Sequence, residues 1–298
     1  MSRLRTRMAC VSASWTPTAH LHVGNLAWAA AGGDGGLPPT DSLAWGDPLV
    51  GFADIWSDGR RADVSLHVDP RASAGIHHHI VAEIVELAPQ VALEASRQDS
   101  PLVTALMANG FSEQEGPWYV QLSRDMFDLS DLDTPTPSGY RVRATGPDEL
   151  VERVELHQRC WAPARIKSLL GIPLAGNEAG SSSDVDKHRN VMASPVYRPE
   201  LDIVAEATDG SLCAYGIGWF DPRSSSVLFE PIGTDPNHSQ LGLARAVCAE
   251  ILRTAAGLGA THAVVGPRGD DAYPIPRHLY ERLGMIEVAQ HVEYRRDT

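Results

Sequence analysis

The feature of this sequence that most constrains its fold is an internal repeat, in which one pattern of residues occurs twice. Residues 69–84 read DPRASAGIHHHIVAEI, and residues 235–251 read DPNHSQLGLARAVCAEI. Each copy begins with Asp-Pro, reaches a Gly followed by Ile or Leu, and arrives at Ala-Glu-Ile seven residues after that Gly. Further along, LMANGF at 106–111 in the first copy corresponds to LYERLGM at 279–285 in the second. Chance similarity of apolar helices is the alternative, but two matches in the same order predict two related domains of one fold.

A chain of 298 residues has room for two domains of ordinary size. The stretch DLSDLDTPTPSG at 128–139 is rich in Asp, Pro, Thr and Ser and shows no apolar period, which is typical of a linker. We therefore expect a first domain at 1–127, a linker at 128–138 and a second domain at 139–298.

The composition narrows the classes of partner. The sequence holds 25 Lys and Arg against 38 Asp and Glu, a formal charge of −13, which disfavours binding to nucleic acid. It contains no run of eighteen apolar residues, so we expect no membrane span. The basic N-terminus lacks the apolar core of an export signal. A monomer or homodimer without nucleic-acid or membrane partners is the expectation.

The four cysteines are scattered without the CxxC spacing of a metal site or a disulfide framework. They are Cys10, Cys160, Cys213 and Cys248. This pattern suits a reducing cytoplasm, and it predicts no metal. The run His77-His78-His79 does not change that expectation, because successive helical side chains point about 100° apart and do not converge on one ion.

The second domain has a clear sequence of expected elements, in the order β-α-βββ-α-β-α-β, which predicts an α/β class with an α+β mixed sheet. The Asp209-Gly210 pair marks a tight hairpin turn. The stretch 170–200 has no clear period and is expected to be a long functional or mobile loop. The expected strands are 139–145, 201–207, 211–220, 226–234, 261–267 and one or two within 286–296, and the helices are 147–161, 238–258 and 276–284.

Pro231 lies in the middle of the apolar strand 226–234. Proline donates no ladder hydrogen bond, so a central strand tolerates it only at a bulge or where pairing has ended. We expect the strand to part from its neighbour there. The exposed backbone groups would accept an extended, amide-bearing chain such as a pantetheine arm as a pseudo-strand.

Shortly after this strand, the segment 239–244 opens a helix with two small residues, Gly242 and Ala244. Close approach to the backbone, unpaired N–H groups of the first turn and the helix dipole together favour a pyrophosphate. Packing of small residues against a strand is an equal explanation for such a loop alone. The proline-bearing strand just upstream favours the phosphate site.

These residues resemble the GNAT superfamily of N-acetyltransferases, and the whole chain is similar to the tandem-GNAT arrangement of actinobacterial enzymes such as mycothiol synthase. The acyl-CoA signature of that superfamily, Arg/Gln-x-x-Gly-x-Gly/Ala, appears as Ser239-x-x-Gly242-x-Ala244 after Pro236-x-His238. Its later motif appears as Asp271 followed by Leu279-Tyr280-Glu281-x-x-Gly284. The resemblance covers the second domain well and the first 127 residues weakly.

The resemblance implies two tandem GNAT-like domains, with a degenerate N-terminal copy. It also implies acetyl-CoA as co-substrate and direct acetyl transfer to a primary amine of a small molecule in a ternary complex. Two departures stand out: Ser239 replaces the usual Arg or Gln, and Asp271 replaces Asn. The first removes a long donor near the phosphates, so weaker binding of CoA is expected.

The resemblance assigns roles to particular residues. Glu230 is expected to take the proton of the ammonium group, although a strand Glu paired with Arg or Lys is the plain alternative. Tyr280 is expected to serve the leaving thiolate, and packing of an aromatic ring is its alternative. The N–H of Ile232 is the expected oxyanion donor. The full expected donor site comprises Ile232, Gly233, Thr234, Ser239, Gln240, Leu241, Gly242, Leu243, Ala244 and Asp271.

The first domain lacks these features. The position of Glu230 is Val64 in the first copy, and that of Tyr280 is Leu106 or Met107. We expect this copy to perform no chemistry, with Gly75 as the one trace of a vestigial CoA site.

The sequence does not identify the acceptor of the acetyl group. Asp184, Asp186 and His188 could meet a cationic acceptor, but a solvated loop is the favoured interpretation. Two further functions stay open: an acyltransferase for a longer acyl-CoA or a carrier-protein thioester, and a non-catalytic CoA-binding module. Ser239 and Asp271 favour the module, and the retained Glu230 and Tyr280 speak against it.

Overall fold

The computed structural model describes residues 2–32, 38–132, 134–161 and 183–297. The strands are β1 (Asp41–Trp45), β2 (Gly51–Ser57), β3 (Arg61–Val68), β4 (Gln90–Ser96), β5 (Ser112–Glu113), β6 (Tyr119–Asp125), β7 (Tyr140–Ala144), β8 (Asp202–Ala207), β9 (Leu212–Asp221), β10 (Ser226–Thr234), β11 (His262–Val265) and β12 (Ile286–Arg296). The helices are α1 (Ser2–Ser14), α2 (Val23–Ala30), α3 (Ala74–Val85), α4 (Ser100–Ala108), α5 (Leu150–Cys160), α7 (Val185–Met192), α8 (Leu243–Gly257) and α9 (Ile275–Glu281), with single 3₁₀ turns η1 (Pro199–Leu201) and η2 (Pro236–His238).

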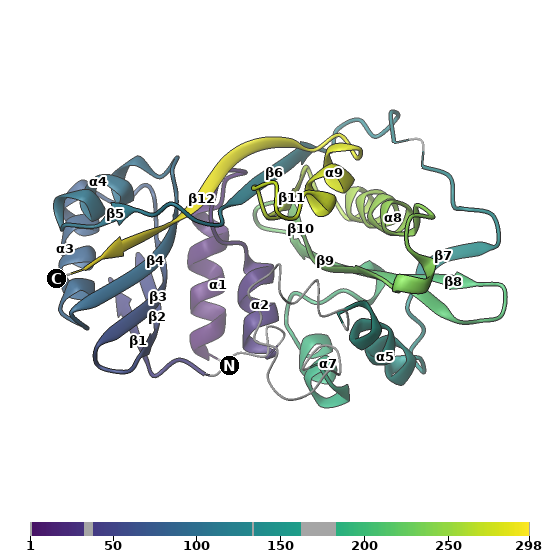
Figure 1. The fold of residues 1–298 in the computed structure, drawn as a ribbon, viewed down its shortest axis with the longest axis horizontal. Coiled ribbons are helices and arrows are strands. Elements are labelled where there is room, and N and C mark those ends of the chain that lie inside the picture. Colours follow the sequence, from purple (N-terminus) through teal and green to yellow (C-terminus); the bar gives the residue numbers. More distant parts are fainter. Residues whose placement is uncertain (1, 33–37, 133, 162–182, 298) are drawn as a thin grey trace.

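All the strands belong to one continuous mixed sheet, which crosses the whole molecule (Figure 1). The order is β1-β2-β3-β4-β12-β6-β11-β10-β9-β8-β7, and the short β5 pairs with β12. Helices cover both faces: α1, α2, α5 and α7 lie on one, and α3, α4, α8 and α9 on the other. The predicted mixed-sheet α/β class is confirmed.

The repeat seen in the sequence is also a repeat in the structure. In the first half, β2 and β3 are antiparallel, and α3 connects β3 to the parallel strand β4. In the second half, β9 and β10 are antiparallel, and α8 connects β10 to the parallel strand β11. The two halves therefore share one architecture, as the Asp-Pro and Ala-Glu-Ile matches predict.

The two halves exchange their last strands. β6, which ends the first half, lies between β11 and β12, and β12, which ends the chain, lies between β6 and β4. β6 pairs with β11, and β12 pairs with β4. Without the exchanged strand, each of these partners would form an open edge of the sheet. The segment around 128–138 connects the halves along the chain, but the sheet itself has no break there.

The helices α1 and α2 also join the two halves, because they pack on strands of both. Their buried core includes Phe52 of β2 together with Trp219 of β9 and Leu228 of β10. The helices at the start of the chain thus cover the part of the sheet that bears Pro231 (Figure 1).

The expected elements of the second half match the observed ones to within a few residues, with two corrections. The helix expected from 238 begins at Leu243, because η2 and a turn with positive φ at Gln240 and Gly242 precede it. The stretch 170–200 is not simply a long loop, since it contains α7. Asp184 caps this helix by accepting a hydrogen bond from the Lys187 N–H at 2.8 Å. Eight residues are too short a run to show a helical period in the sequence.

Candidate active site

β10 and β11 part in the middle of β10. Their parallel pairing joins Ser226–Leu228 to His262–Val264 and goes no further, although β10 continues to Thr234. On the other side, the register with β9 shifts between Phe229 and Ile232, across the cis Glu230-Pro231 peptide. The bulge and the separation expected at Pro231 are confirmed.

The backbone beyond the bulge presents N–H groups to this gap. The Asp235 N–H donates to the Cys213 carbonyl oxygen of β9 at 2.8 Å. Because hydrogen-bonded and non-hydrogen-bonded pairs alternate in an antiparallel ladder, Gly233 also bonds β9, and the N–H groups of Ile232 and Thr234 point to the opposite side. β11 no longer pairs with β10 there. The Ile232 N–H therefore points away from β9.

Glu230 lies half-buried in the bulge, and its carboxylate is held by a residue of the first half. The Asn25 side-chain amide donates to Glu230 Oε2 at 2.8 Å. The orientation of Asn25 is fixed because its Oδ1 accepts the His22 N–H at 2.8 Å, as part of the capping box of α2. Sequence reasoning missed Asn25, and the only signal was the cap-like spacing of His22 and Asn25.

Close packing holds α2 against the strand that bears Glu230. A Cβ atom on Gly24 would lie 2.5 Å from the Cβ of Trp219, so only glycine permits this approach. The Trp219 indole N–H in turn donates to the Glu230 carbonyl oxygen at 2.6 Å. Trp219 is fully buried.

Tyr280 is buried on α9, with its ring centroid 6.2 Å from that of Phe229 in β10. Burial, and then the nearby Cys248 and Glu230 side chains, raise the pKa of Tyr280 well above that of a free phenol. Tyr280 therefore keeps its proton at neutral pH, and it lies close enough to Glu230 for the two to influence each other.

The loop before α8 is exposed from Ser239 to Gly242. Gly242 occupies the N-cap position with φ +83°, and no side chain caps the helix. The first intrahelical bond runs from the Ala246 N–H to the Gly242 carbonyl oxygen, so the N–H groups of Leu243, Ala244 and Arg245 have no intrahelical acceptor. Such a helix start suits an anion.

Asp271, the remaining residue of the expected donor site, is exposed in the turn between β11 and α9. α9 begins at Ile275 with Pro274 at its N-cap position. Pro276 follows within the first turn of this helix.

The acidic and histidine residues expected to lie in a solvated loop are part of a folded helix instead. Asp184 is the N-cap of α7, and Asp186 pairs with Arg189 at 2.7 Å. His188 is buried, with Nε2 3.4 Å from Asp202 Oδ2. The interpretation of His188 as a solvated residue was wrong.

Asp202 is the centre of a buried ionic cluster under α5 and α7. Its carboxylate lies 2.9 Å from the Arg153 guanidinium and accepts the Tyr197 hydroxyl at 3.1 Å. Burial alone would raise the pKa of Asp202, but Arg153 and His188 outweigh it and hold this pKa at about 2. Residues 162–182, which include the first part of the loop expected at 170–200, lie outside the described residues.

The first half lacks the corresponding features within its described residues. β3 pairs with β2 over its whole length without a register shift, and Val64 is buried where β10 has Glu230. Leu106, at the position of Tyr280, is buried in the apolar core. Gly75 lies inside α3, while Gly242 forms the N-cap of α8.

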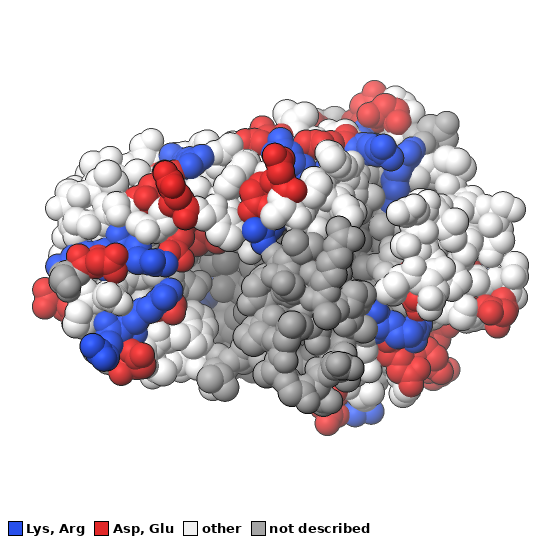
Figure 2. All heavy atoms as spheres, in the orientation of Figure 1, with Lys and Arg blue, Asp and Glu red and all other residues white. Residues whose placement is uncertain are grey.

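The surface shown in Figure 2 carries basic and acidic side chains interspersed, with Asp and Glu gathered around α5. Such a distribution agrees with the net charge of −13. All four cysteines are free thiols. A search of the described helices finds none with the length and apolar character needed to cross a membrane.

Comparison with known proteins places this geometry in a fold family. No protein-family model matches the sequence, and no curated protein matches it. A tandem GNAT protein from the clavulanic acid biosynthesis pathway matches the structure with a TM-score of 0.60 at 16% identity, over 98% of this chain and 93% of that one. The chain has the tandem GNAT fold.

Two further solved structures support this GNAT assignment. A GCN5-related N-acetyltransferase from Sphaerobacter thermophilus has a TM-score of 0.53 and 18% identity, covering 99% of this chain and 91% of its own. A GNAT-family acetyltransferase from Colwellia psychrerythraea has a TM-score of 0.59 and 10% identity, with 99% and 96% covered. Both similarities extend over nearly the whole of this chain, so its first half also belongs to the shared fold.

Proposed function

We propose that this protein is an N-acetyltransferase that transfers the acetyl group of acetyl-CoA to a primary amine of a small molecule. Transfer occurs directly in a ternary complex, and the second half carries the chemistry. The separation of β10 from β11 at the bulge that bears Glu230 is the observation that supports this proposal most strongly. Four free thiols fit the reducing cytoplasm that we propose as its location.

The donor would lie along the gap side of β10. Its amide-bearing arm pairs with the backbone of residues 232–234, and its pyrophosphate binds the uncapped start of α8 beside Gly242. Ser239 supplies only a short hydroxyl there. Backbone N–H groups therefore provide most of the phosphate contacts, and we expect moderate rather than tight binding of acetyl-CoA.

The reaction would proceed in three steps. Glu230, directly or through a water molecule, takes a proton from the ammonium group of the acceptor, and the neutral amine attacks the thioester carbonyl carbon. The Ile232 N–H stabilises the oxyanion of the tetrahedral intermediate. The C–S bond then breaks, and Tyr280 donates its proton to the CoA thiolate. The attacking nitrogen gives up its second proton to the tyrosinate, directly or through water, which leaves a neutral amide, free CoA and the restored tyrosine. The raised pKa of Tyr280 suits a group that must stay protonated until this step.

The proposal is tested by measuring release of free CoA thiol from acetyl-CoA in the presence of a panel of small amines. We expect thiol release that requires both an amine and the side chains of Glu230 and Tyr280 in the second half. Binding of acetyl-CoA without turnover of any amine would favour a non-catalytic CoA-binding module. Calorimetric titration with acetyl-CoA and with longer acyl-CoAs distinguishes the acetyl donor from the longer-chain alternative.

A further inference from the structure

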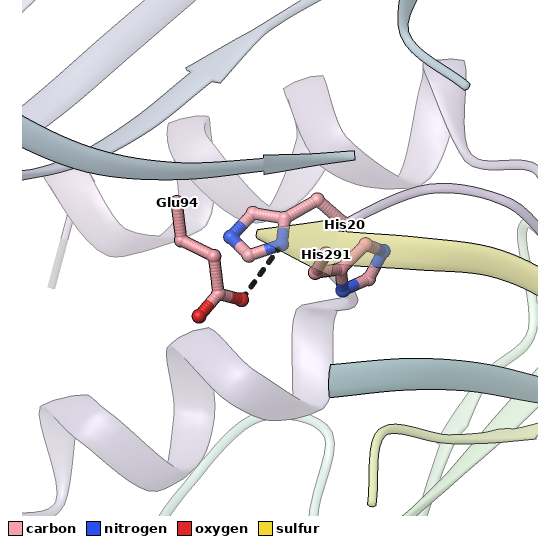
Figure 3. A group of neighbouring side chains, drawn as sticks. All are labelled: His20, Glu94 and His291. Atoms are coloured by element: carbon pink, nitrogen blue, oxygen red, sulfur yellow. Dashed lines mark ion pairs between the residues drawn. The ribbon is translucent and has the colours of Figure 1, made fainter. Parts of the chain in front are cut away.

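Three side chains that are far apart in the sequence meet in the first half of the molecule, away from Glu230. His20 lies between α1 and α2, Glu94 lies in β4, and His291 lies in β12 (Figure 3). One potential ligand atom of each lies within 4.8 Å of the others. His20 Nδ1 is 3.5 Å from Glu94 Oε1, and the two imidazole rings stand edge to face with centroids 4.7 Å apart.

The imidazole of His291 places a buried nitrogen here without a hydrogen bond. His291 is 4% exposed, and its Nε2 has no hydrogen-bond partner in the described structure. Nδ1 of His20 makes no hydrogen bond of good geometry among the described residues, although it lies 3.5 Å from Glu94 Oε1. A buried polar atom without a partner costs about 1–3 kcal/mol, so Nε2 of His291 requires an explanation.

The cluster occupies the place in the first half that corresponds to the donor gap of the second. Parallel pairing of β3 with β4 ends at Val64 and Leu93, immediately before Glu94. A cavity of about 90 Å³ opens there, and His20, Glu94 and His67 help to line it. His67 Nε2 is also buried without a hydrogen-bond partner among the described residues. This cavity leaves room for a water molecule beside His20 and Glu94.

We propose that His20, Glu94 and His291 bind one Zn²⁺ ion, with water as the fourth ligand. Two imidazoles and one carboxylate form a donor set that zinc accepts. A tetrahedral ion with bonds of about 2.0–2.1 Å keeps its ligand atoms about 3.4 Å apart. The His20–Glu94 separation of 3.5 Å already matches this geometry, and a ligand atom of His291 lies within 4.8 Å of both.

The ion would connect three separate segments of the fold. β12 belongs to the second half of the chain, while β4 and the α1–α2 connection belong to the first. Zinc would therefore clamp the exchanged strand β12 to the segment that leads into α2. Binding should stabilise the folded protein by an amount that grows with the logarithm of the free zinc concentration once this exceeds the Kd. This inference does not depend on the proposed acetyl transfer.

The test uses the full chain, freed of metal by dialysis against a chelator. Titration with Co²⁺ followed by visible absorption, and displacement by Zn²⁺, should give one site per chain. His20→Ala and Glu94→Gln remove ligands that are partly exposed, so both variants should fold. Each should weaken zinc binding by roughly 10- to 100-fold or more, since losing even an outer-shell partner costs that much.

His79→Ala is the matched control, because His79 forms an exposed pair with Glu83 at 3.1 Å, outside the cluster. Zinc should raise the unfolding temperature of the wild type and of His79→Ala, and have much less effect on His20→Ala. Zinc content well below one per chain in the wild type, or equal affinity in His20→Ala and His79→Ala, would overturn the site. No outcome involves acetyl-CoA, so failure here and failure of the proposed enzyme activity are separate results.

Discussion

The two halves of the molecule place the same strand in the same position and make different use of it. β3 pairs with β2 without interruption and carries Val64, whereas β10 is bulged against β9 and carries Glu230. Both strands separate from their parallel neighbour, after four paired positions in the first half and three in the second. The separation therefore belongs to the fold, while the proposed function assigns a chemical role to the bulge and the carboxylate.

The comparison also shows that the halves are not independent. The first half holds the Glu230 carboxylate through Asn25 and covers β10 with α2. The exchange of β6 and β12 joins the strands of the two halves into one sheet. A half without catalytic groups of its own thus has a structural role in the site of the other, and the predictions below test this division of labour.

The largest effect is expected from Glu230→Gln. An amide cannot take the ammonium proton, so turnover at neutral pH should fall by roughly 100-fold, within the range typical of general bases. The pH optimum should move upward, because the amine must then lose its proton to solvent before it attacks. The pH–rate profile measures both changes. Glu83→Gln, at an exposed position on α3 of the first half, serves as the control and should leave the profile unchanged.

Tyr280→Phe should lower turnover by roughly 10- to 100-fold, with little change in the affinity for acetyl-CoA. The variant keeps the buried ring and removes the hydroxyl proton needed by the leaving thiolate. Steady-state kinetics and calorimetric binding separate the two quantities. Tyr294→Phe, whose hydroxyl donates to Glu113 at 3.4 Å, is the matched control. Equal turnover in both variants would remove Tyr280 from the mechanism.

A pair of glycine substitutions compares the two helix starts. Gly242 has φ +83°, where an L-residue costs about 1–2 kcal/mol, so Gly242→Ala should raise the KM for acetyl-CoA several-fold. Gly75 lies within α3, and a Cβ there meets only Ser73 Oγ at 3.9 Å. Gly75→Ala should leave KM unchanged and stabilise the protein by about 0.5–1 kcal/mol. A rise in KM for Gly75→Ala instead would move the donor site to the first half.

Asn25→Ala should have the smallest effect on rate, a few-fold drop in kcat without a change in the KM for acetyl-CoA. The substitution removes the donor that orients Glu230 and one member of the α2 capping box, which costs about 1 kcal/mol of stability. Asn109→Ala, which removes a bond to the Ala105 carbonyl oxygen at the end of α4, should lower stability without lowering kcat. Identical kinetics in the two variants would show that Asn25 acts only as a cap.

Sequence reasoning identified the repeat, the fold and the bulge, because proline, glycine and hydrophobic periodicity act locally. It missed Asn25, since the contact with Glu230 depends on how α2 packs over β9 and β10, which no local pattern encodes. The strand exchange escaped it for a similar reason: β6 and β12 read as ordinary strands, and only the sheet decides their neighbours. His20, Glu94 and His291 likewise lie on three segments without any motif spacing.

The most direct test of the division between the halves is a crystal structure with a non-reactive acetyl-CoA analogue in which a methylene group replaces the sulfur-bearing link. We predict the acyl end between β10 and β11 beside Glu230 and Tyr280, with the pyrophosphate at the Gly242 turn. Density for the analogue in the gap between β3 and β4, or a closed β10–β11 gap with the analogue bound elsewhere, would contradict the account.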